Sequence, residues 1–323
     1  MSLVIISMVE AFIYLGIGFT LLYAGGEAVL KGAVGTAQKF QVSPLLIGLT
    51  IVSTGTSLPE LVVSLNAALG GSSGLTLGNI VGSNIANILL LLGLATVFTT
   101  CNIDRKFLKR DGGTLCLVTA IFTGIAYFGS YTWISGVGFL IGLAAYFYYA
   151  YITEKDAPED SFFAEEADVM TVENGKSKLY YILFLIAGVA GVIVGADVFV
   201  EGAISIARFW GVSESVIGLT VVAIGTSLPE MATVIPAARK GHTDVIIGNI
   251  VGSNILNILA VSGVVSLFVP LPVPANMTAI DLPVTLAATV TLMLIATIYG
   301  KLPRITAALF LPAYCFYIYY QFA

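Results

Sequence analysis

Two segments of this chain are near copies of each other, and both place polar and acidic residues inside long apolar runs. The first is Gly48-Leu-Thr-Ile-Val-Ser-Thr-Gly-Thr-Ser-Leu-Pro-Glu60, and Gly218-Leu-Thr-Val-Val-Ala-Ile-Gly-Thr-Ser-Leu-Pro-Glu230 follows 170 residues later (230 − 60). A second pair has the same offset: Gly78-Asn-Ile-Val-Gly-Ser-Asn-Ile-Ala-Asn87 and Gly248-Asn-Ile-Val-Gly-Ser-Asn-Ile-Leu-Asn257. Polar groups are costly inside a membrane and mark candidate ion or substrate sites. The repetition predicts a membrane transporter built from two related halves.

The composition is that of a polytopic membrane protein. Of the 323 residues 58% are hydrophobic and 10% are charged, whereas a typical soluble domain has about 25% charged residues. The three cysteines, Cys101, Cys116 and Cys315, lack C-x-x-C spacing, so they predict neither a disulfide framework nor a zinc site. The apolar N-terminus has no positive n-region and no clear cleavage site, so we interpret it as a first span.

The hydropathy pattern predicts an all-α fold with ten transmembrane helices. Windows of about 19 residues, broken at polar or Gly/Pro clusters, set their limits. The predicted spans are 3–34, 43–69, 76–99, 108–128, 132–152, 178–206, 212–238, 244–267, 279–299 and 303–321. Residues 154–177 hold eight of the 19 acidic residues and are predicted to be a soluble linker. The chain thus divides into a five-helix repeat at 1–153, this linker, and a second five-helix repeat at 178–323.

Lysine and arginine positions predict the orientation of these spans. Thirteen of the 14 lie in or beside the linker and the loops on its side of the membrane, and only Arg208 lies on the other side. The positive-inside rule therefore puts the linker in the cytoplasm and both termini outside. Five is an odd number, so the second repeat enters from the opposite side and is inverted, and matching segments should meet near the bilayer midplane. Compactness and the short linker favour a prokaryotic-type plasma membrane.

A glycine and a proline interrupt the second and seventh predicted spans, so we expect both helices to break. Proline removes a backbone donor and clashes with the preceding turn. Carbonyls freed near Ser53 and Ala223 would end a half-helix, where the partial negative charge favours a cation. A capping box, with Ser57 as the N-cap and Glu60 reaching back, is the alternative. Its repetition inside apolar segments argues against that role alone, because a buried carboxylate costs on the order of 2.5–3.5 kcal/mol.

Side chains four residues apart share one helix face, and this spacing groups the candidate ligands. Thr56 and Glu60 have it, as do Ser83 and Asn87 in the following span. The two halves together offer two carboxylates, two amides and several hydroxyls. Such hard oxygen ligands suit Ca²⁺ or Na⁺. For Asn87 and Asn257, hydrogen bonding between packed helices is the competing interpretation.

Several other polar or small residues remain open at this stage. Packing or loop hydrogen bonds are favoured over ion ligation for Asn79, Asn84, Asn249 and Asn254. The glycines of spans one and six favour close helix packing over a sliding surface. Glu27 and Asp197, also 170 residues apart, are not assigned as ligands, and the single histidine, His242, is expected in a solvated turn.

The doubled G-T-S-L-P-E and G-S-N-I-x-N-I elements resemble the alpha repeats of the sodium/calcium exchanger family, within the wider cation/Ca²⁺ exchanger superfamily. The resemblance covers essentially the whole chain. It implies a shared Ca²⁺ and Na⁺ site with backbone carbonyls from Ser53 and Ala223. It further implies movement of the first and sixth spans against the remaining core. The side chains that it places in the site are those of Thr56, Ser57, Glu60, Ser83, Asn87, Thr226, Ser227, Glu230, Ser253 and Asn257. Some family members carry aspartate at position 257, so this chain has only two carboxylates at the centre.

The function expected is secondary antiport of Na⁺ against Ca²⁺ by alternating access. Ca²⁺ exchange against H⁺ is the close alternative, because two nearby carboxylates repel each other when no cation is bound. A cation channel and a non-transporting membrane sensor are two more distant alternatives. We expect no enzymatic activity, no cofactor and no nucleic-acid partner, since no P-loop or acyl-transfer triad is present. The coupling stoichiometry and the oligomeric state are not fixed by the sequence.

Overall fold

The computed structural model describes residues 8–40, 48–155, 176–210 and 223–322. Most of the predicted linker, and residues 212–222 of the predicted seventh span, lie outside the described residues. The described chain is helical apart from four strands of two residues each. The prediction of an all-α architecture is thereby confirmed.

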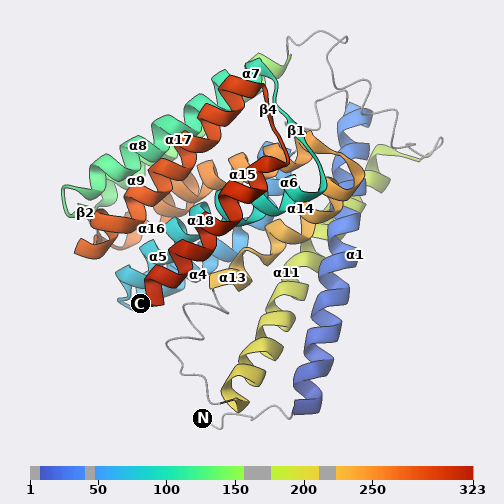
Figure 1. Cartoon of the computed structure of the whole chain (residues 1–323), viewed down its shortest axis with the longest axis horizontal. Coiled ribbons are helices and arrows are strands. Elements are labelled where there is room, and N and C mark those ends of the chain that lie inside the picture. Colours follow the sequence, from blue (N-terminus) through green and yellow to red (C-terminus); the bar gives the residue numbers. More distant parts are fainter. Residues whose placement is uncertain (1–7, 41–47, 156–175, 211–222, 323) are drawn as a thin grey trace.

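The first half runs from a long helix through a broken one to three more helical segments (Figure 1). Several segments contain π-helical turns, which are labelled η. In order, the elements are α1 (Met8–Phe40), η1 (Gly48–Val52), α3 (Ser53–Thr56), α4 (Leu58–Leu69), α5 (Ser73–Ile85), η2 (Ala86–Leu92), α6 (Gly93–Phe98), β1 (Cys101–Asn102), α7 (Arg105–Phe107), η3 (Leu108–Gly112), α8 (Gly113–Ala126), β2 (Ser130–Tyr131) and α9 (Trp133–Lys155).

The second half presents a matching series of elements. These are α11 (Lys178–Phe209), α13 (Ala223–Thr226), α14 (Leu228–Lys240), α15 (Thr243–Leu256), η5 (Asn257–Val261), α16 (Ser262–Phe268), β3 (Leu271–Pro272), η6 (Met277–Asp281), α17 (Leu282–Tyr299), β4 (Lys301–Leu302) and α18 (Ile305–Phe322). Within the described residues, six helical runs are long and apolar enough to cross a membrane, and two shorter apolar helices accompany them. The number of spans, ten, stays a prediction.

Short strand pairs tie each half to the other. Strand β1 pairs antiparallel with β4, and β2 pairs in the same way with β3. The register joins Cys101 to Leu302 and Tyr131 to Leu271. The partner of every strand therefore lies in the opposite half of the sequence.

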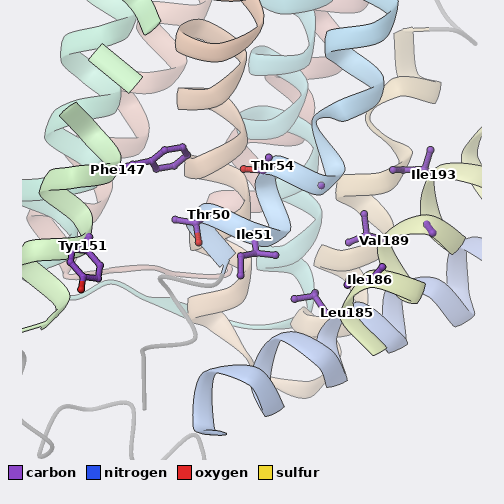
Figure 2. A pocket seen from close by; sticks show the side chains of 11 residues that line it. Thr50, Ile51, Thr54, Phe147, Tyr151, Leu185, Ile186, Val189 and Ile193 are labelled. Carbon is purple, nitrogen blue, oxygen red and sulfur yellow. The ribbon is translucent and has the colours of Figure 1, made fainter. Parts of the chain in front are cut away.

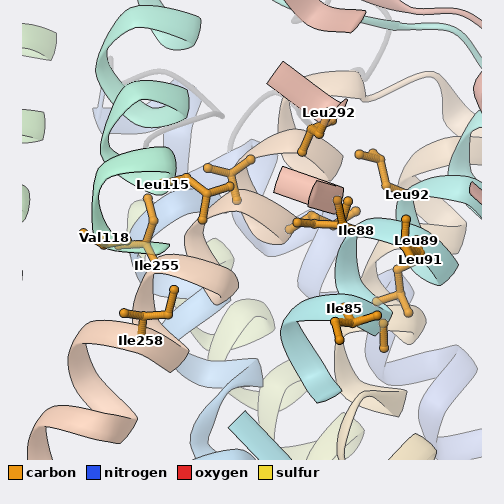
Figure 3. Packing of buried hydrophobic residues seen from close by; sticks show 14 of the residues in the cluster. Ile85, Ile88, Leu89, Leu91, Leu92, Leu115, Val118, Ile255, Ile258 and Leu292 are labelled. Atoms are coloured by element: carbon orange, nitrogen blue, oxygen red, sulfur yellow. The ribbon is translucent and has the colours of Figure 1, made fainter. Parts of the chain in front are cut away.

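The centre of the molecule is formed by α5 with η2 and by α15 with η5. These two runs are strongly apolar on average, with mean hydropathies of 2.0 and 1.8, and about four fifths of each is buried. Here Ile85, Ile88, Ile255 and Ile258 are completely buried in one large apolar cluster, to which α8 and α17 add Leu115 and Leu292 (Figure 3).

Helices α1 and α11 pack along each other and form a second, smaller apolar cluster. Glycines recur every seven residues on both contact faces, and the backbone of the partner helix approaches them closely. A Cβ atom added at Gly188 would lie 2.5 Å from the backbone nitrogen of Val29. The paired glycines are Gly18, Gly25 and Gly32 in α1 and Gly188, Gly195 and Gly202 in α11. Close packing, the favoured interpretation, is what these contacts show.

We predict that Gly188→Ala lowers the thermal stability of the detergent-solubilised protein, because the added methyl group meets the backbone of α1. Overpacking of this kind costs typically about 1–3 kcal/mol. Gly191→Ala, one turn away on the same helix, is the matched control, since its added Cβ would meet only the Cα of Gly25, at 3.7 Å. The unfolding midpoints of both variants test this, and equal midpoints would contradict it.

Candidate ion-binding site

Both copies of the duplicated motif break their helix at the serine before the proline. Ser57 separates α3 from α4, and Ser227 separates α13 from α14. The serines occupy N-cap positions, yet neither makes a side-chain capping hydrogen bond. The capping-box alternative is therefore not what the structure shows. The prediction of broken helices at these two motifs is met by the described segments.

The carbonyl of Ser53 is not freed by the break, contrary to our expectation. It accepts the backbone N–H of Ser57 at 2.9 Å, because the last turn of α3 closes before Pro59 is reached. The Thr56 hydroxyl also lies within 3.4 Å of the same carbonyl oxygen, as a second, weaker donor. Ala223 is the first residue of α13, at the matching place in the second half.

The two motif glutamates are buried at the centre, where the halves meet. Glu60 is 1% exposed and Glu230 is fully buried, and the hydroxyl of Ser57, three residues before Glu60, donates to Glu230 across the two halves. Burial of a charge is costly unless it is paired. Within the described residues, no cluster of three His, Cys, Asp or Glu side chains exists, so any cation held here would be bound by the two carboxylates together with neutral oxygens.

An unusual number of oxygens in this region have no hydrogen-bond partner among the described residues. Buried polar groups are normally satisfied, and each exception calls for an explanation such as an ion. Both carboxylate oxygens of Glu60 and one of Glu230 belong to this set. The neutral oxygens in it are Ser83 Oγ, Ser227 Oγ, Asn87 Oδ1 and Asn257 Oδ1. All seven atoms come from residues expected in the site.

Asparagines of one half hold those of the other in a fixed orientation. Asn87 Nδ2 donates to Asn254 Oδ1 at 3.3 Å, and Asn257 Nδ2 donates to Asn84 Oδ1 at 3.1 Å. The amide nitrogens of Asn87 and Asn257 are thereby engaged across the halves, and their carbonyl oxygens remain available as ligands. Asn84 and Asn254 thus act as orienting partners, which the sequence left open.

The threonines of the broken helices are bound in the same crosswise way. Thr56 Oγ1 donates to Asn249 Oδ1, and Thr226 Oγ1 donates to Asn79 Oδ1, both at 3.3 Å. Asn79 in turn donates to Ser64 Oγ at 3.0 Å and Asn249 donates to Thr233 Oγ1 at 2.7 Å. These contacts link the broken helix of each half to the α5 or α15 helix of the other, so that the two halves position each other's candidate ligands.

Serine hydroxyls distinguish the two glutamates. Ser57 Oγ and Ser253 Oγ both donate to Glu230 Oε1, each at 3.4 Å. Usual O–H···O bonds measure 2.5–3.0 Å, so these contacts are weak and easily replaced by a cation. On the other side, the hydroxyls of the corresponding serines, Ser227 and Ser83, and the carboxylate oxygens of Glu60 have no hydrogen-bond partner among the described residues.

Glycine lets the central helices approach the broken one. A Cβ added at Gly252 of α15 would lie 2.8 Å from the carbonyl oxygen of Leu49 and would also meet the hydroxyl of Ser53. Ser53 itself donates to the Leu49 carbonyl at 2.6 Å. The close-packing interpretation of the G-x-x-x-G glycines therefore holds for Gly252.

A cavity of about 730 Å³ lies beside the broken helix but does not include the candidate ligands (Figure 2). It lies between η1 and α3, α9 and α11, and its lining is mostly apolar. Thr50, Thr54 and Gly55 line the side formed by the broken helix, next to Thr56.

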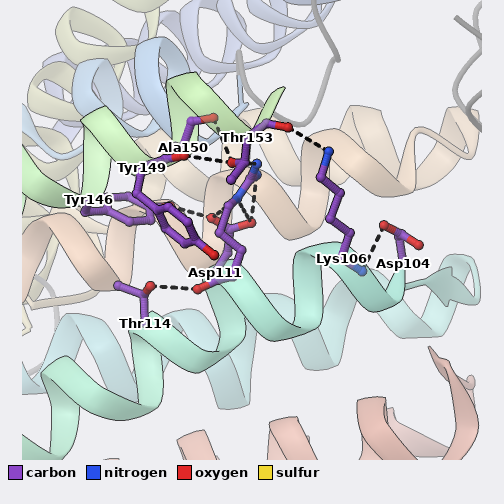
Figure 4. A network of polar contacts seen from close by, with 9 residues as sticks. Asp104, Lys106, Asp111, Thr114, Tyr146, Tyr149, Ala150 and Thr153 are labelled. Atoms are coloured by element: carbon purple, nitrogen blue, oxygen red, sulfur yellow. Dashed lines mark hydrogen bonds and ion pairs between the residues drawn. The ribbon is translucent and has the colours of Figure 1, made fainter. Parts of the chain in front are cut away.

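Sequence reasoning missed a second buried polar cluster, which joins η3 to α9 (Figure 4). Asp111 accepts from Arg110 Nε at 2.9 Å and from the Tyr146 hydroxyl at 3.0 Å, and Arg110 also donates to Thr153. In the second half Tyr317 donates to Asp281 at 3.0 Å. The sequence did contain one indication of this cluster: Asp111 and Asp281 are separated by 170 residues, the same offset as the duplicated motifs (281 − 111).

A buried arrangement of two carboxylates with amide and hydroxyl oxygens, between broken helices of an apolar protein, is suited to binding a hard cation. Few charges are available to hold a larger polar substrate. These are the features of a membrane cation transporter.

Comparison with known proteins identifies the family. Residues 10–152 and 180–323 match the family described as sodium/calcium exchanger protein. The sodium/calcium exchanger MaX1 of Methanosarcina acetivorans is 31% identical over 327 residues, covering 91% of this chain and 93% of MaX1. The inner membrane protein YrbG of Escherichia coli is 36% identical over 260 residues, covering 79% of this chain and 78% of YrbG. The chain belongs to the sodium/calcium exchanger family.

Solved structures agree with this membership. A structure of the sodium-calcium exchanger NCX_Mj, soaked with Na⁺ and Sr²⁺, superposes with a TM-score of 0.85 at 33% identity. The match covers 97% of this chain and 99% of that one. The protein is accordingly an all-α membrane protein of a family that exchanges cations against Ca²⁺.

We predict that Ca²⁺ raises the thermal unfolding midpoint of the purified protein, because a ligand that binds only the folded state stabilises it. At a concentration of about 100 times Kd the gain is about 2.7 kcal/mol. Glu230→Gln should abolish the shift. Asp281→Asn, which neutralises a carboxylate outside the site, should retain it, and a shift of equal size with Glu230→Gln would contradict this placement of the ion.

His242 corrects one expectation, since it is buried rather than solvated. It forms the N-cap of α15 and is 6% exposed. Desolvation, and secondarily the nearby Lys240, lower the pKa of this histidine below its ordinary value. The neutral imidazole is therefore the form that fits the folded protein.

We predict that stability falls as the pH drops below about 6.5, the usual histidine pKa. In that window the unfolded chain binds a proton that the folded chain resists, so the free energy of unfolding decreases with decreasing pH. His242→Gln should flatten this part of the profile, which thermal unfolding between pH 5 and 8 would measure. An unchanged slope would show that His242 does not contribute.

Proposed function

We propose that the chain is a secondary antiporter that exchanges Na⁺ for Ca²⁺ across a membrane, with the ions competing for one site. The observation that carries this proposal is the set of seven buried oxygens without partners, contributed by both halves. Two glutamates can neutralise one Ca²⁺, and the accompanying amide and hydroxyl oxygens are ligands that both ions accept. Three Na⁺ ions would leave one positive charge, which would make exchange electrogenic.

The site proposed for these ions comprises Glu60 and Glu230 with the neutral oxygens around them. Its other side chains are Thr56, Ser57, Ser83, Asn87, Thr226, Ser227, Ser253 and Asn257, with carbonyls of Ser53 and Ala223. The weak serine contacts of Glu230 support this role, because a carboxylate held by two 3.4 Å hydrogen bonds can turn to a cation at little cost. Asn84 and Asn254 keep the amide oxygens directed to the ion.

The names of relatives support Na⁺ and Ca²⁺ as the exchanged ions. MaX1 is named a sodium/calcium exchanger, and the NCX_Mj structure is described in terms of extracellular ion exchange and binding-site occlusion with Na⁺ and Sr²⁺. This chain shares about a third of its residues with each. Proton coupling, which would use the same carboxylates, is an outcome that the test below separates.

The proposed topology has ten spans in two inverted repeats, residues 1–153 and 178–323, with both termini outside. Residues 154–177 would then form a cytoplasmic linker. The reciprocal strand pairs and the crosswise Thr–Asn contacts support the two-fold relation. The E. coli relative is named an inner membrane protein, which favours a prokaryotic plasma membrane. Alternating access follows if the site opens to each side in turn.

The test uses purified protein in liposomes loaded with Na⁺ and diluted into Na⁺-free medium with tracer Ca²⁺. We expect Ca²⁺ uptake that follows the Na⁺ gradient. Uptake should fall about a hundredfold or more in Glu60→Gln and in Glu230→Gln, because each variant removes a carboxylate that would pair with the buried cation, and loss of one partner from a buried charge pair costs about 3–5 kcal/mol. Asp281→Asn, reconstituted at the same density, is the control and should retain uptake.

Other outcomes would change the assignment. Uptake driven only by a pH gradient would replace Na⁺ by H⁺ as the coupling ion. Ca²⁺ flux without any counter-gradient would indicate a channel, and no Ca²⁺ flux under either gradient would refute the substrate. A variant that folds, binds Ca²⁺ and transports without either glutamate would refute the site.

A further inference from the structure

The helix pair formed by α1 and α11 is joined to the second half's site helix, α14, at two points. Gly26 of α1 lies against the backbone carbonyl of Ala232, so close that no side chain could be accommodated. Eight residues later, at the last residue of α14, Lys240 forms an ion pair with Glu27 of α1. Both charged side chains are about a third exposed, at 39% and 33%.

Lys240 is well placed for this contact by its own helix. A cation at the C-terminus of a helix interacts favourably with the partial negative charge there. Gly241 follows with a φ of 78° and ends α14, which fixes the position from which the lysine side chain extends. The other end of α14 carries Glu230, so the ion pair and a candidate ion ligand lie on one short helix.

No equivalent contact is seen in the described part of the first half. Helix α1 packs along α14, whereas no comparable packing joins α11 to α4 among the described residues. The structure thus departs from two-fold symmetry and represents one arrangement of the helix pair. If the halves exchange roles, as the proposed inverted repeats allow, α11 would pack on α4 in the second arrangement.

The end of α4 has no lysine at the position that Lys240 occupies in α14. Adding 170 to the numbers of the first half, Gly71 with a φ of 80° corresponds to Gly241 with a φ of 78°. Gly70 therefore stands where α14 has Lys240, and Asp197 stands where α1 has Glu27. In the exchanged arrangement Asp197 would face a glycine, and no ion pair could form there.

We propose that Glu27 and Lys240 are positioning residues that stabilise one access state of the exchanger over the other. The inference rests on the proposed alternating access at the Glu60–Glu230 site. The pair is remote from the candidate ligands, so it affects the population of the state and not the intrinsic affinity of the site. Apparent affinity at each membrane face equals the intrinsic affinity scaled by the fraction of the state open to that face.

The experiment measures the apparent KM for Ca²⁺ on each face, in right-side-out and inverted membrane vesicles. We expect Glu27→Gln and Lys240→Gln to change the ratio of the two KM values by about two- to fivefold, the range for a part-exposed ion pair. The KM should rise on one face and fall on the other. The charge-reversed double variant Glu27→Lys with Lys240→Glu, and the conservative Lys240→Arg, should move the ratio back towards the wild-type value.

The other half supplies a gain-of-function control. Gly70→Lys would place a lysine opposite Asp197 in the exchanged arrangement, and the φ of −76° at Gly70 accepts a side chain. We expect Gly70→Lys to shift the KM ratio in the same direction as Lys240→Gln, because both changes favour the exchanged arrangement. Gly70→Ala should leave the ratio unchanged, and Asp197→Asn in the Gly70→Lys background should cancel the effect.

An unchanged ratio in both neutral variants would overturn the inference, as would equal changes of KM on the two faces, which indicate general damage to the site. Both results require that the wild-type protein exchanges Ca²⁺, so they leave the proposed function intact. Absence of Ca²⁺ exchange by the wild type under either gradient would overturn the proposed function itself, and this inference with it.

Discussion

The burial of two carboxylates at the centre of an apolar protein is the constraint on which the rest of the structure depends. Glu60 and Glu230 are at most 1% exposed, and a charge so placed is costly without compensation. The broken helices, the engaged asparagine nitrogens and the partnerless oxygens all reduce that cost only when a cation is present. If the proposed site is correct, a bound cation supplies the missing compensation, and the folded protein is more stable with the ion than without it.

Close helix packing is what brings the compensating groups together. Gly252 allows α15 to contact the segment that carries Ser53, and the amides of each half bind side chains of the other. π-helical turns begin at Ala86 and Asn257, at or beside the asparagines of the candidate site. Such turns are frequent at functional sites because they re-aim side chains within an otherwise regular helix.

Much of the fold and part of the candidate site could be predicted from the sequence, because a duplicated polar motif in an apolar chain has few possible interpretations. The breaks at Ser57 and Ser227 followed from proline, whereas the full set of candidate ligands came from the family resemblance and is still a proposal. The roles of Asn84 and Asn254 could not be predicted, since their amide partners are 173 and 167 residues away in the chain. The burial of His242 was also missed, because a short polar turn between helices predicts exposure unless the elements that cover the turn are known. The prediction of a free carbonyl at Ser53 was wrong, because the geometry of a single turn decides which carbonyls stay without a hydrogen bond at a helix break.

The crossed strand pairs have a consequence for how the protein is made. β1 and β2 are synthesised and inserted well before β4 and β3, their only strand partners in the described chain. Both strands lie between predicted spans, so water can bond their backbone groups until the second half arrives. The two strand pairs therefore form in a late, long-range step of assembly, in which each half supplies the strand that the other lacks.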